Sequence, residues 1–371
     1  MTSCDSRVIP SCVQSTPTTL TPFVVSLGAT LLLGVLQTLC VGATIDPGDI
    51  ISAQFNNSGT ILVVDPATGD REILSQWPSI GAGPRMRSPY SIAALPDGDF
   101  LAVESFTTQG LFRIDSTSGD RTFISGLGGD GAGEPSNRGT GLIDAVRSVH
   151  LTPGGEIFLV NQAGGNMTGG GFITRVDPVT GNRMLVSGQG AGAGPVFDAP
   201  QTGALDADGQ LIVADYSQRA IFEVDLTTGA RSILSDASHG TGPVFGQVRD
   251  LAILPSGDIV AIAETSIGAS TYSLFGVDPA TGNRSVIAAN TPVYQALSLG
   301  NDGWMLGSFN SIVRIDPANG AETLVSGQSR GTGPAMTTWG DMVQIPVPEP
   351  STLAMLLAAL PLGYLAYRRS R

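Results

Sequence analysis

Side chains that carry oxygen recur at one position of a repeated phrase in this sequence. The position lies six residues after the Gly of each Pro/Asp–Gly turn. The residues found there are Gln54, Glu104, Asn161, Asp215, Ala263 (with Glu264 next to it) and Phe309. Carboxylate and amide oxygens are the ligands that hard cations such as Ca²⁺ prefer. Glu104, Asn161, Asp215 and Glu264 are therefore candidate metal ligands, with Ca²⁺ as the candidate cofactor. The alternative is that each side chain caps a loop or lines a channel.

Other kinds of catalytic site find little support. The chain contains no Lys, which excludes Schiff-base chemistry and a Lys general base. Its two histidines, His150 and His239, do not make a metal cluster, and there is no Gly-x-Ser-x-Gly motif and no P-loop. A net charge of -13 argues against nucleic acid as a partner. No catalytic residue is assigned.

The candidate ligands belong to a unit that is written six times. One phrase reads strand, turn, strand, with an Asp-Pro-x-Thr-Gly type of turn. Its copies are VDPATGDREIL from Val64, IDSTSGDRTFI from Ile114, VDPVTGNRMLV from Val176, VDLTTGARSIL from Val224, VDPATGNRSVI from Val277 and IDPANGAETLV from Ile315. A second hairpin phrase precedes most copies, as in SIAALPDGDFLAVES from Ser91. Four short antiparallel strands repeated six times predict an all-β, six-bladed β-propeller over residues 44–346. Seven blades or an array of sandwiches is the competing architecture.

The two ends of this region complement each other. The segment GTGPAMTTWGDMVQIP, from Gly331, aligns without gaps to GTGPVFGQVRDLAILP, from Gly240, and so reads as a first strand without a second. The stretch from Pro47 to Ile51 reads as the missing turn and second strand. We therefore expect a C-terminal strand to close the ring by pairing with the N-terminal strand, which leaves no exposed edge strand.

The two faces of such a disc should differ. The stereotyped turns share one face and are expected to be structural. The irregular loops share the other face, and loops on a rigid scaffold are where binding usually occurs. The Arg after each turn is expected to pack against the hairpin or to pair with nearby acids; these residues are Arg71, Arg121, Arg183, Arg231 and Arg284.

Both chain ends look like processing signals. An apolar run from Phe23 to Leu39 precedes Val41-Gly42-Ala43, so residues 1–43 read as a signal peptide cleaved by signal peptidase after Ala43. An uncleaved N-terminal anchor is the alternative. Residues 347–371 hold Pro348-Glu349-Pro350, an apolar run from Leu353 to Tyr367, and a tail with Arg368 and Arg369. The run is short for a membrane span, and the arginines read as a stop.

This order of parts resembles the PEP-CTERM sorting signal of Gram-negative bacteria. The resemblance covers the last ~25 residues. It implies export, a short transmembrane helix that associates transiently with the inner membrane, cleavage by an exosortase near Pro348-Glu349-Pro350, and delivery to the cell envelope or extracellular matrix. The propeller region resembles gluconolactonase-type propellers at Glu104, Asn161 and Asp215, although it lacks their Glu-Gly-Pro opening, and it resembles NHL-type repeats at Asp215 in Val-Ala-Asp-Tyr-Ser-Gln.

Two functions follow from these observations. The first is a non-catalytic binding or scaffold protein with a polysaccharide or protein ligand. The second is a metal-dependent lactonase- or esterase-like hydrolase that acts on the loop-rich face. In the gluconolactonase-type family the resemblance implies that the metal polarises a lactone carbonyl.

Overall fold

The computed structural model describes residues 43–347, except 130, 164–169, 266–270, 293, 295, 309 and 338–339. Most of the expected signal peptide and all of the sorting residues, Pro348, Glu349, Pro350, Arg368 and Arg369, lie outside these ranges. Within the described residues, no helix is both long and apolar enough to cross a membrane.

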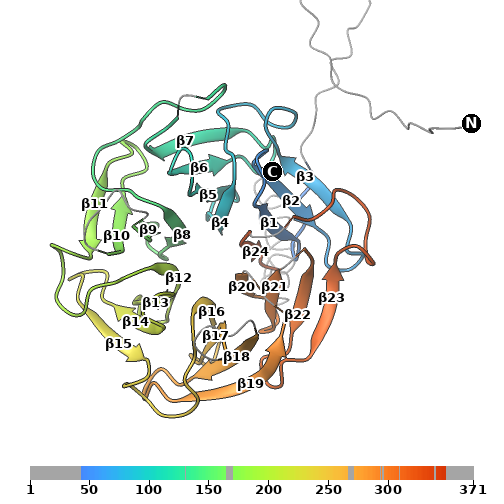
Figure 1. Cartoon of the computed structure of the whole chain (residues 1–371). Coiled ribbons are helices and arrows are strands. Elements are labelled where there is room, and N and C mark those ends of the chain that lie inside the picture. Colours follow the sequence, from blue (N-terminus) through green and yellow to red (C-terminus); the bar gives the residue numbers. More distant parts are fainter. Residues whose placement is uncertain are drawn as a thin grey trace, which may run out of the picture. The chain divides into compact units, whose positions relative to one another are not determined.

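Six four-stranded antiparallel sheets stand around a central axis (Figure 1). We number them as blades in chain order, from the innermost strand outward. Blade 1 consists of β24 (Met342–Gln344), β1 (Ile50–Gln54), β2 (Thr60–Val64) and β3 (Arg71–Ser75). Blade 2 consists of β4 (Pro89–Ala94), β5 (Phe100–Glu104), β6 (Gly110–Ile114) and β7 (Arg121–Gly126). Blade 3 consists of β8 (Val146–Leu151), β9 (Ile157–Asn161), β10 (Phe172–Val176) and β11 (Arg183–Ser187).

The other three blades follow the same order. Blade 4 consists of β12 (Pro200–Leu205), β13 (Leu211–Asp215), β14 (Ala220–Val224) and β15 (Arg231–Ser235). Blade 5 consists of β16 (Val248–Ile253), β17 (Ile259–Glu264), β18 (Tyr272–Val277) and β19 (Arg284–Thr291). Blade 6 consists of β20 (Ala296–Leu299), β21 (Met305–Ser308), β22 (Ile312–Ile315) and β23 (Glu322–Ser326). The predicted six-bladed propeller is confirmed.

The ring closes inside blade 1, as the sequence predicts. Strand β24 pairs antiparallel with β1, with Ile50 opposite Gln344 and Ser52 opposite Met342. The innermost strands also contact their neighbours around the whole ring, including β24 with β4 and β20 with β24. Both edges of the N-terminal strand β1 are therefore paired, which removes a site for edge-to-edge association.

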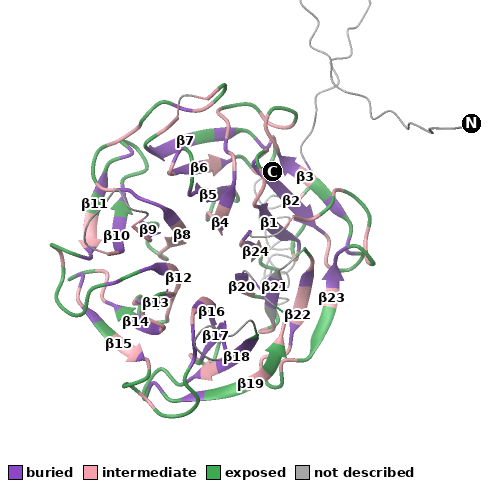
Figure 2. Cartoon of the chain, in the orientation of Figure 1, coloured by how far each residue is buried: buried purple, intermediate pink, exposed green. Residues whose placement is uncertain are grey.

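Apolar side chains fill the space between adjacent blades. Strand residues such as Phe112, Phe158, Phe222 and Phe275 are almost fully buried, and Figure 2 shows buried segments concentrated in the strands. Each hydrophobic cluster of the described residues draws its members from two neighbouring blades. The blades are thus held mainly by packing sheet on sheet, because an isolated four-stranded sheet would leave both faces exposed to water.

The turn between the third and fourth strand is built in the same way in each blade. In blade 1, Asp65 accepts the backbone N–H of Ala67 at 2.8 Å and the hydroxyl of Thr68 at 2.7 Å. Gly69 has a φ of 84°, a left-handed conformation that suits glycine. These hydrogen bonds favour the carboxylate and lower the pKa of Asp65.

The Arg that follows this turn connects two blades. Arg231 of blade 4 donates to the hydroxyl of Ser187 in blade 3 at 2.8 Å and to the carbonyls of Pro195 and Ala191 in the connecting link at 2.7 and 2.9 Å. We call this unit an arginine bridge. Five such bridges run from Arg71, Arg121, Arg183, Arg231 and Arg284 to Ser326, Ser75, Ser125, Ser187 and Ser235 respectively.

The expectation that these arginines pair with nearby acids is wrong. These arginine residues are between 3% and 8% exposed, and their hydrogen-bond acceptors among the described residues are a serine hydroxyl and main-chain carbonyls. The serine lies in the preceding blade, 44 residues away in the case of Arg231. A sequence read hairpin by hairpin does not show this partner.

Candidate functional site

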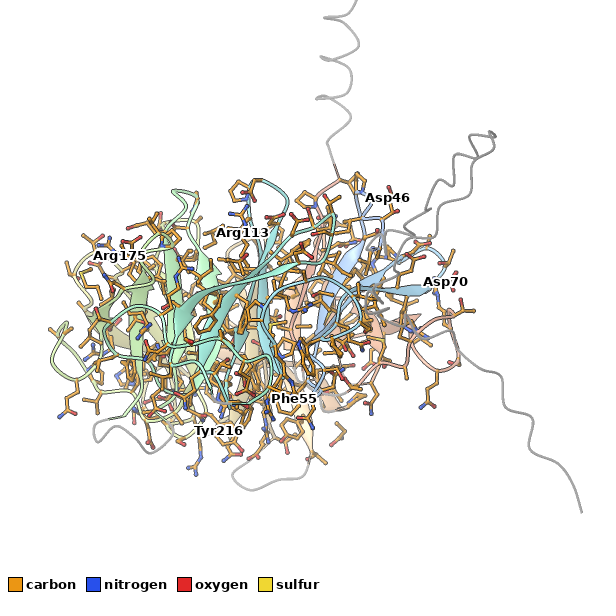
Figure 3. All side chains as sticks on the ribbon, turned by 90° about the horizontal axis from the view of Figure 1, so that it is seen from above. Asp46, Phe55, Asp70, Arg113, Arg175 and Tyr216 are labelled. Carbon is orange, nitrogen blue, oxygen red and sulfur yellow. The ribbon has the colours of Figure 1, made fainter. Side chains whose placement is uncertain are left out.

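The two faces of the disc differ as the sequence predicts. Figure 3 shows Asp46, Arg113 and Arg175 on one face, where the stereotyped turns lie, Asp70 at the rim, and Phe55 and Tyr216 on the opposite face. We call these the turn face and the loop face.

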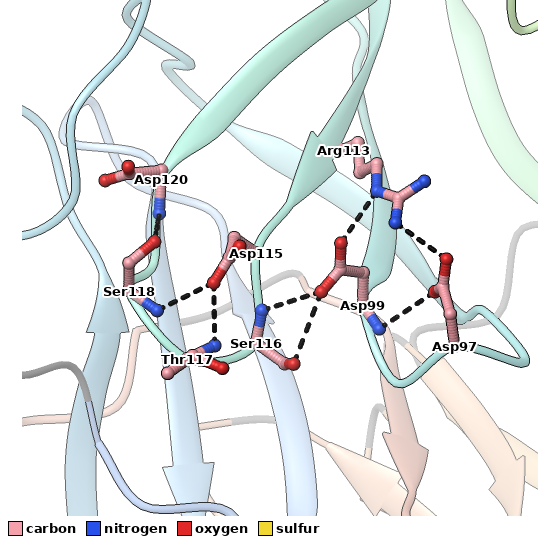
Figure 4. Close-up of polar contacts among 8 residues, drawn as sticks. All are labelled: Asp97, Asp99, Arg113, Asp115, Ser116, Thr117, Ser118 and Asp120. Atoms are coloured by element: carbon pink, nitrogen blue, oxygen red, sulfur yellow. Dashed lines mark hydrogen bonds and ion pairs between the residues drawn. The ribbon is translucent and has the colours of Figure 1, made fainter.

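Charged groups on the turn face serve the turns themselves. Arg113 donates to Asp99 and Asp97, at 2.7 Å in each case, and Asp115 accepts the backbone N–H groups of Thr117 and Ser118 (Figure 4). These contacts hold neighbouring turns of blade 2 together. A structural role is therefore sufficient to explain them.

The expected metal ligands lie one strand outward from the central channel. They end the second strand of their blades, while the channel is lined by the first strands, β4, β8, β12, β16, β20 and β24. Glu104, Asn161 and Asp215 are 0% exposed, and Glu264 is 6% exposed. Among the described residues, no three His, Cys, Asp or Glu side chains gather in a group that could hold a metal ion.

Two of these carboxylates cap loops. Glu104 accepts the backbone N–H groups of Phe106 at 2.9 Å, Thr107 at 2.7 Å and Thr108 at 2.6 Å, all in the loop that follows it. Asp215 accepts Gln218 N–H at 2.9 Å from the following loop and Asp198 N–H at 2.7 Å from the preceding link. Burial raises the pKa of Asp215.

The other two side chains also hold the backbone next to their strands. The Asn161 Oδ1 accepts Asp144 N–H at 3.3 Å, and its Nδ2 donates to Thr174 Oγ1 at 3.2 Å. A Glu264 carboxylate oxygen accepts Gln247 N–H at 3.5 Å. The structure thus gives each of the four a capping or bridging contact, and Ca²⁺ binding by them stays a prediction.

The structure points instead to the loop-face end of the channel. Four first strands begin with a β-bulge, which lies between Pro89 and Ser91, Val146 and Ser148, Pro200 and Thr202, and Val248 and Asp250. The bulged residues are Tyr90, Arg147, Gln201 and Arg249. A bulge leaves its extra residue out of the ladder and re-aims its side chain, here toward the axis. All four side chains line one small cavity on that axis.

Aromatic rings surround the two arginines. The Arg147 guanidinium lies 4.9 Å from the Tyr90 ring centre and 5.8 Å from that of Phe106. The Arg249 guanidinium lies 4.7 Å from the Tyr216 ring centre and 5.6 Å from that of Tyr272. Phe55 extends the first group, with its ring centre 5.4 Å from that of Phe106. We define the channel mouth as the four bulged residues together with Phe55, Phe106, Tyr216 and Tyr272.

Hydrogen bonds fix the orientation of both guanidiniums. Arg147 donates through Nε and Nη2 to Oε1 of Gln162, with an Nε–Oε1 distance of 2.6 Å. Arg249 donates through Nε and Nη2 to the Tyr272 hydroxyl, at 3.2 and 2.9 Å. Each guanidinium is therefore held by one edge, which reduces the side-chain entropy that a ligand would have to remove.

A ring of polar side chains lies directly beneath the mouth. Asp341 accepts the Ser91 hydroxyl at 2.8 Å and Ile92 N–H at 3.4 Å. Asp250 accepts Leu297 N–H of the next blade at 2.7 Å and Leu251 N–H at 2.8 Å. Burial, with mutual repulsion adding to it for Asp250, raises the pKa of both carboxyl groups. These carboxyl groups connect adjacent blades at the axis.

The channel is closed at the level of this ring. The cavity between the mouth and the two carboxyl groups has a volume of about 20 Å³, which has room for little more than one water molecule. Toward the turn face the channel opens into a hollow of about 430 Å³, lined in part by His150. Burial lowers the pKa of His150 to about 4, so its imidazole is neutral at pH 7. At the level of the ring, the cavity is too small for a group much larger than a water molecule.

Sequence reasoning missed the mouth and the ring, although a signal was present. In the aligned copies GAGPRMRSPYSIAALP and GTGPVFGQVRDLAILP, Tyr90 aligns with Arg249 and Ser91 with Asp250. The same two columns hold Arg147 and Ser148 in blade 3. Polar residues next to an apolar first strand, repeated in several copies, were therefore visible in the alignment.

The chain is similar in structure to several solved propellers. One is a chain from the structure described as a nidogen/laminin complex, with a TM-score of 0.57 and 14% identity over 81% of this chain and 99% of that chain. A second is TolB from Acinetobacter baumannii, with a TM-score of 0.52 and 14% identity over 81% of this chain and 67% of that one. A third is a protein from Bacteroides uniformis described as a putative 6-phosphogluconolactonase, with a TM-score of 0.50 and 11% identity over 81% and 100% of the two chains.

Comparisons of sequence add no relative to this list. No protein-family model matches the chain, and no curated protein matches its sequence. At identities of 11% to 14%, the structural likenesses show the fold alone, and that fold is the β-propeller.

Proposed function

We propose that this chain is an exported, non-catalytic binding or scaffold protein of the cell envelope or extracellular matrix. Its N-terminal 43 residues are removed by signal peptidase after Ala43, and its C-terminal 25 residues, 347–371, direct it to an exosortase through Pro348-Glu349-Pro350 and the Arg tail. The propeller then presents its loop face to a polysaccharide or protein. The order of the sorting signal's parts supports the location, and the channel mouth supports the binding role.

The observation that carries the binding role is the fixed orientation of Arg147 and Arg249 between aromatic rings. Aromatic and arginine side chains are enriched at binding hot spots because they provide large contact area and directed hydrogen bonds. The turn face offers a contrast, because there Arg113 is paired with two carboxylates.

Co-sedimentation with matrix material tests this role. Residues 43–347 contain all 24 strands of the closed ring, so this part can be produced by itself. It would be mixed with extracellular matrix from a Gram-negative host that contains an exosortase. We expect binding that is lost in the Arg147→Ala/Arg249→Ala double variant. Binding should be kept in Arg314→Ala, which removes a turn-face arginine lying 4.2 Å from the Trp304 ring centre.

Two treatments sharpen this test. Protease treatment of the matrix should abolish binding if the ligand is a protein, and periodate treatment should abolish it if the ligand is a polysaccharide. Equal binding by wild type and the double variant would contradict the proposal. Mass spectrometry of the full chain expressed in that host checks the processing, with expected ends after Ala43 and near Pro348-Glu349-Pro350.

The hydrolase hypothesis has its own test. A melting-temperature increase with Ca²⁺, Mg²⁺, Mn²⁺ or Zn²⁺ that disappears in Asp215→Ala and Asn161→Ala would support a metal site at the second-strand ends. The contacts described above favour the binding protein, because the carboxylates of Glu104 and Asp215 each already accept three backbone N–H groups.

A further inference from the structure

The channel mouth holds two arginines that are not buried in an arginine bridge and that pair with no carboxylate among the described residues. The net charge is -13, and Arg87, Arg113, Arg175 and Arg314 each form an ion pair with a carboxylate. Among the described residues, Arg147 and Arg249 form none, and their acceptors are a neutral amide and a neutral hydroxyl. The mouth therefore offers two guanidiniums that no carboxylate of the described residues pairs with.

Among the described residues, the two carboxyl groups below the mouth form no hydrogen bond with these guanidiniums. The oxygens of Asp250 accept Leu251 and Leu297 N–H, and those of Asp341 accept Met342 N–H, Ile92 N–H and the Ser91 hydroxyl. Both guanidiniums are held through Nε and Nη2, and Arg147 also lies close to the Tyr90 hydroxyl. Among the described residues, no hydrogen bond from Nη1 of either guanidinium is found, which leaves that part of each fork for an anion.

An apolar surface accompanies this charge. The Phe106 ring lies edge-on to Phe55 and beside Arg147, and Phe106 is 57% exposed. A ligand that satisfies both features must combine an anionic group with a flat apolar face. A sugar ring with a carboxylate meets this requirement, since its C–H face can pack on an aromatic ring while its planar carboxylate matches one edge of a guanidinium.

We propose that the channel mouth binds a carboxylate-bearing saccharide, with Arg147 and Arg249 holding carboxylates and Phe106 packing against a sugar ring. This inference rests on the proposed binding function and names its ligand class. Because the channel is closed below the mouth, the ligand lies across the mouth, so a polymer can be bound at an internal position and need not present an end.

Calorimetric titration with defined oligosaccharides tests the ligand class. The probes are tetramers of galacturonate, mannuronate, guluronate and glucuronate, and the same tetramers with methyl-esterified carboxylates. We expect at least one uronate tetramer to bind and its methyl ester to bind about tenfold more weakly, because the ester cannot form a charge-assisted pair. Absence of binding by all four uronates would overturn the inference.

Matched variants locate the site. Arg147→Ala and Arg249→Ala should each weaken the bound uronate about tenfold, and Phe106→Ala should weaken it severalfold without changing the charge. Arg314→Ala on the turn face should leave the affinity unchanged. Melting curves of each variant check folding, and if Arg147→Ala unfolds, Arg147→Lys keeps the charge without the planar fork and should still bind more weakly. Unchanged affinity in the folded arginine variants would overturn the assignment of the site.

Competitors separate this inference from the proposed function. If a neutral glucan tetramer or polyglutamate binds as tightly as the uronate, with the same dependence on Arg147 and Arg249, the loop face is a binding site and the ligand class proposed here is wrong. Equal binding of dextran sulfate would overturn the preference for carboxylates. If the wild-type protein binds neither the oligosaccharides nor the matrix, both the inference and the proposed binding function are wrong.

Discussion

Five of the six blade interfaces share an arginine bridge, and the interface between blades 5 and 6 does not. Where the others have Arg and Ser, this interface has Glu322 and Ala288. The link between its blades spans only residues 292–295, whereas the link before blade 5 spans 236–247 and supplies the Pro243 and His239 carbonyls to Arg284. The shorter link has no residues in the places of Pro243 and His239. The bridge therefore depends on the link as much as on the arginine.

Apolar packing and an axial carboxyl group hold this interface, whereas the interface of blades 1 and 2 has both an axial carboxyl group, Asp341, and a bridge, from Arg121. A Cβ added to Gly320 would lie 2.3 Å from the Ala288 Cβ, which shows how closely the turn of blade 6 approaches blade 5. Tyr294 of the short link is 2% exposed, and burial raises its pKa, with the nearby Glu322 adding to the effect. Nearer the axis, Asp250 of blade 5 accepts Leu297 N–H of blade 6. In this ring, an arginine joins the blades near the rim at five interfaces. At the sixth interface, a carboxyl group joins them near the axis.

The largest effect is expected from opening the ring itself. Deleting residues 337–346 removes β24, leaves β1 with an unpaired edge and removes Asp341 from the axis. We expect the cooperative melting transition to be lost and the protein to aggregate, because unpaired strand edges associate. Circular dichroism and size-exclusion chromatography measure this. Truncation after Pro346 is the control and should melt as the wild type does; a soluble, cooperatively melting 337–346 deletion would show that ring closure is dispensable.

A smaller effect is expected from removing one bridge. Arg231→Ala deletes hydrogen bonds to Ser187, Pro195 and Ala191 and a contact with Phe197 at 5.4 Å, and leaves the buried Ser187 hydroxyl without its donor. We expect the free energy of unfolding to fall by about 3 kcal/mol. Chemical denaturation measures the change.

The matched variant at the unbridged interface is Glu322→Ala. Glu322 is exposed but lies near the buried Tyr294 hydroxyl, so its removal should lower the free energy of unfolding by no more than about 1 kcal/mol, which is less than the loss expected for Arg231→Ala. Equal losses in Arg231→Ala and Glu322→Ala would contradict the distinction between the two kinds of interface.

The blades could be predicted from turn residues within each hairpin. The channel mouth could not, because it forms from residues of several blades. Gly69 and its counterparts mark turns within a hairpin, so the strand number and the blade order follow from the repeat. The pairing of β24 with β1 also follows, because each end lacks what the other supplies. The channel mouth does not follow, because a bulge beside Tyr90 shifts the alternation of side chains by one residue. A prediction made without the bulges does not direct the first-strand residues toward the axis. It therefore assigns the axial position to second-strand residues such as Asp215.

An effect smaller than the loss of a bridge is expected from pH at the axis. Burial and the neighbouring Asp341 raise the pKa of Asp250 to about 8, above the value of 3.8 of an unperturbed Asp. The folded protein then binds this proton more tightly than the unfolded chain, so its stabilising effect is lost as the pH rises toward 8. His150, whose folded pKa is about 4, acts in the opposite direction, but only between its folded value and 6.5. Between about pH 6.5 and 8.5 we therefore expect the free energy of unfolding to fall by roughly 2 kcal/mol.

Asp250→Asn isolates this effect, because the amide keeps an oxygen for Leu297 N–H and cannot ionise. Its stability should stay flat over the same pH range. If blades 5 and 6 separate first, hydrogen exchange of the Leu297 backbone N–H in the wild type should increase with pH by more than the intrinsic exchange rate does. The increase should be smaller in Asp250→Asn. A parallel decline of stability in both proteins would assign the pH dependence to another group. The interface of blades 5 and 6, which has no arginine bridge, would then be no more sensitive to pH than the other five interfaces.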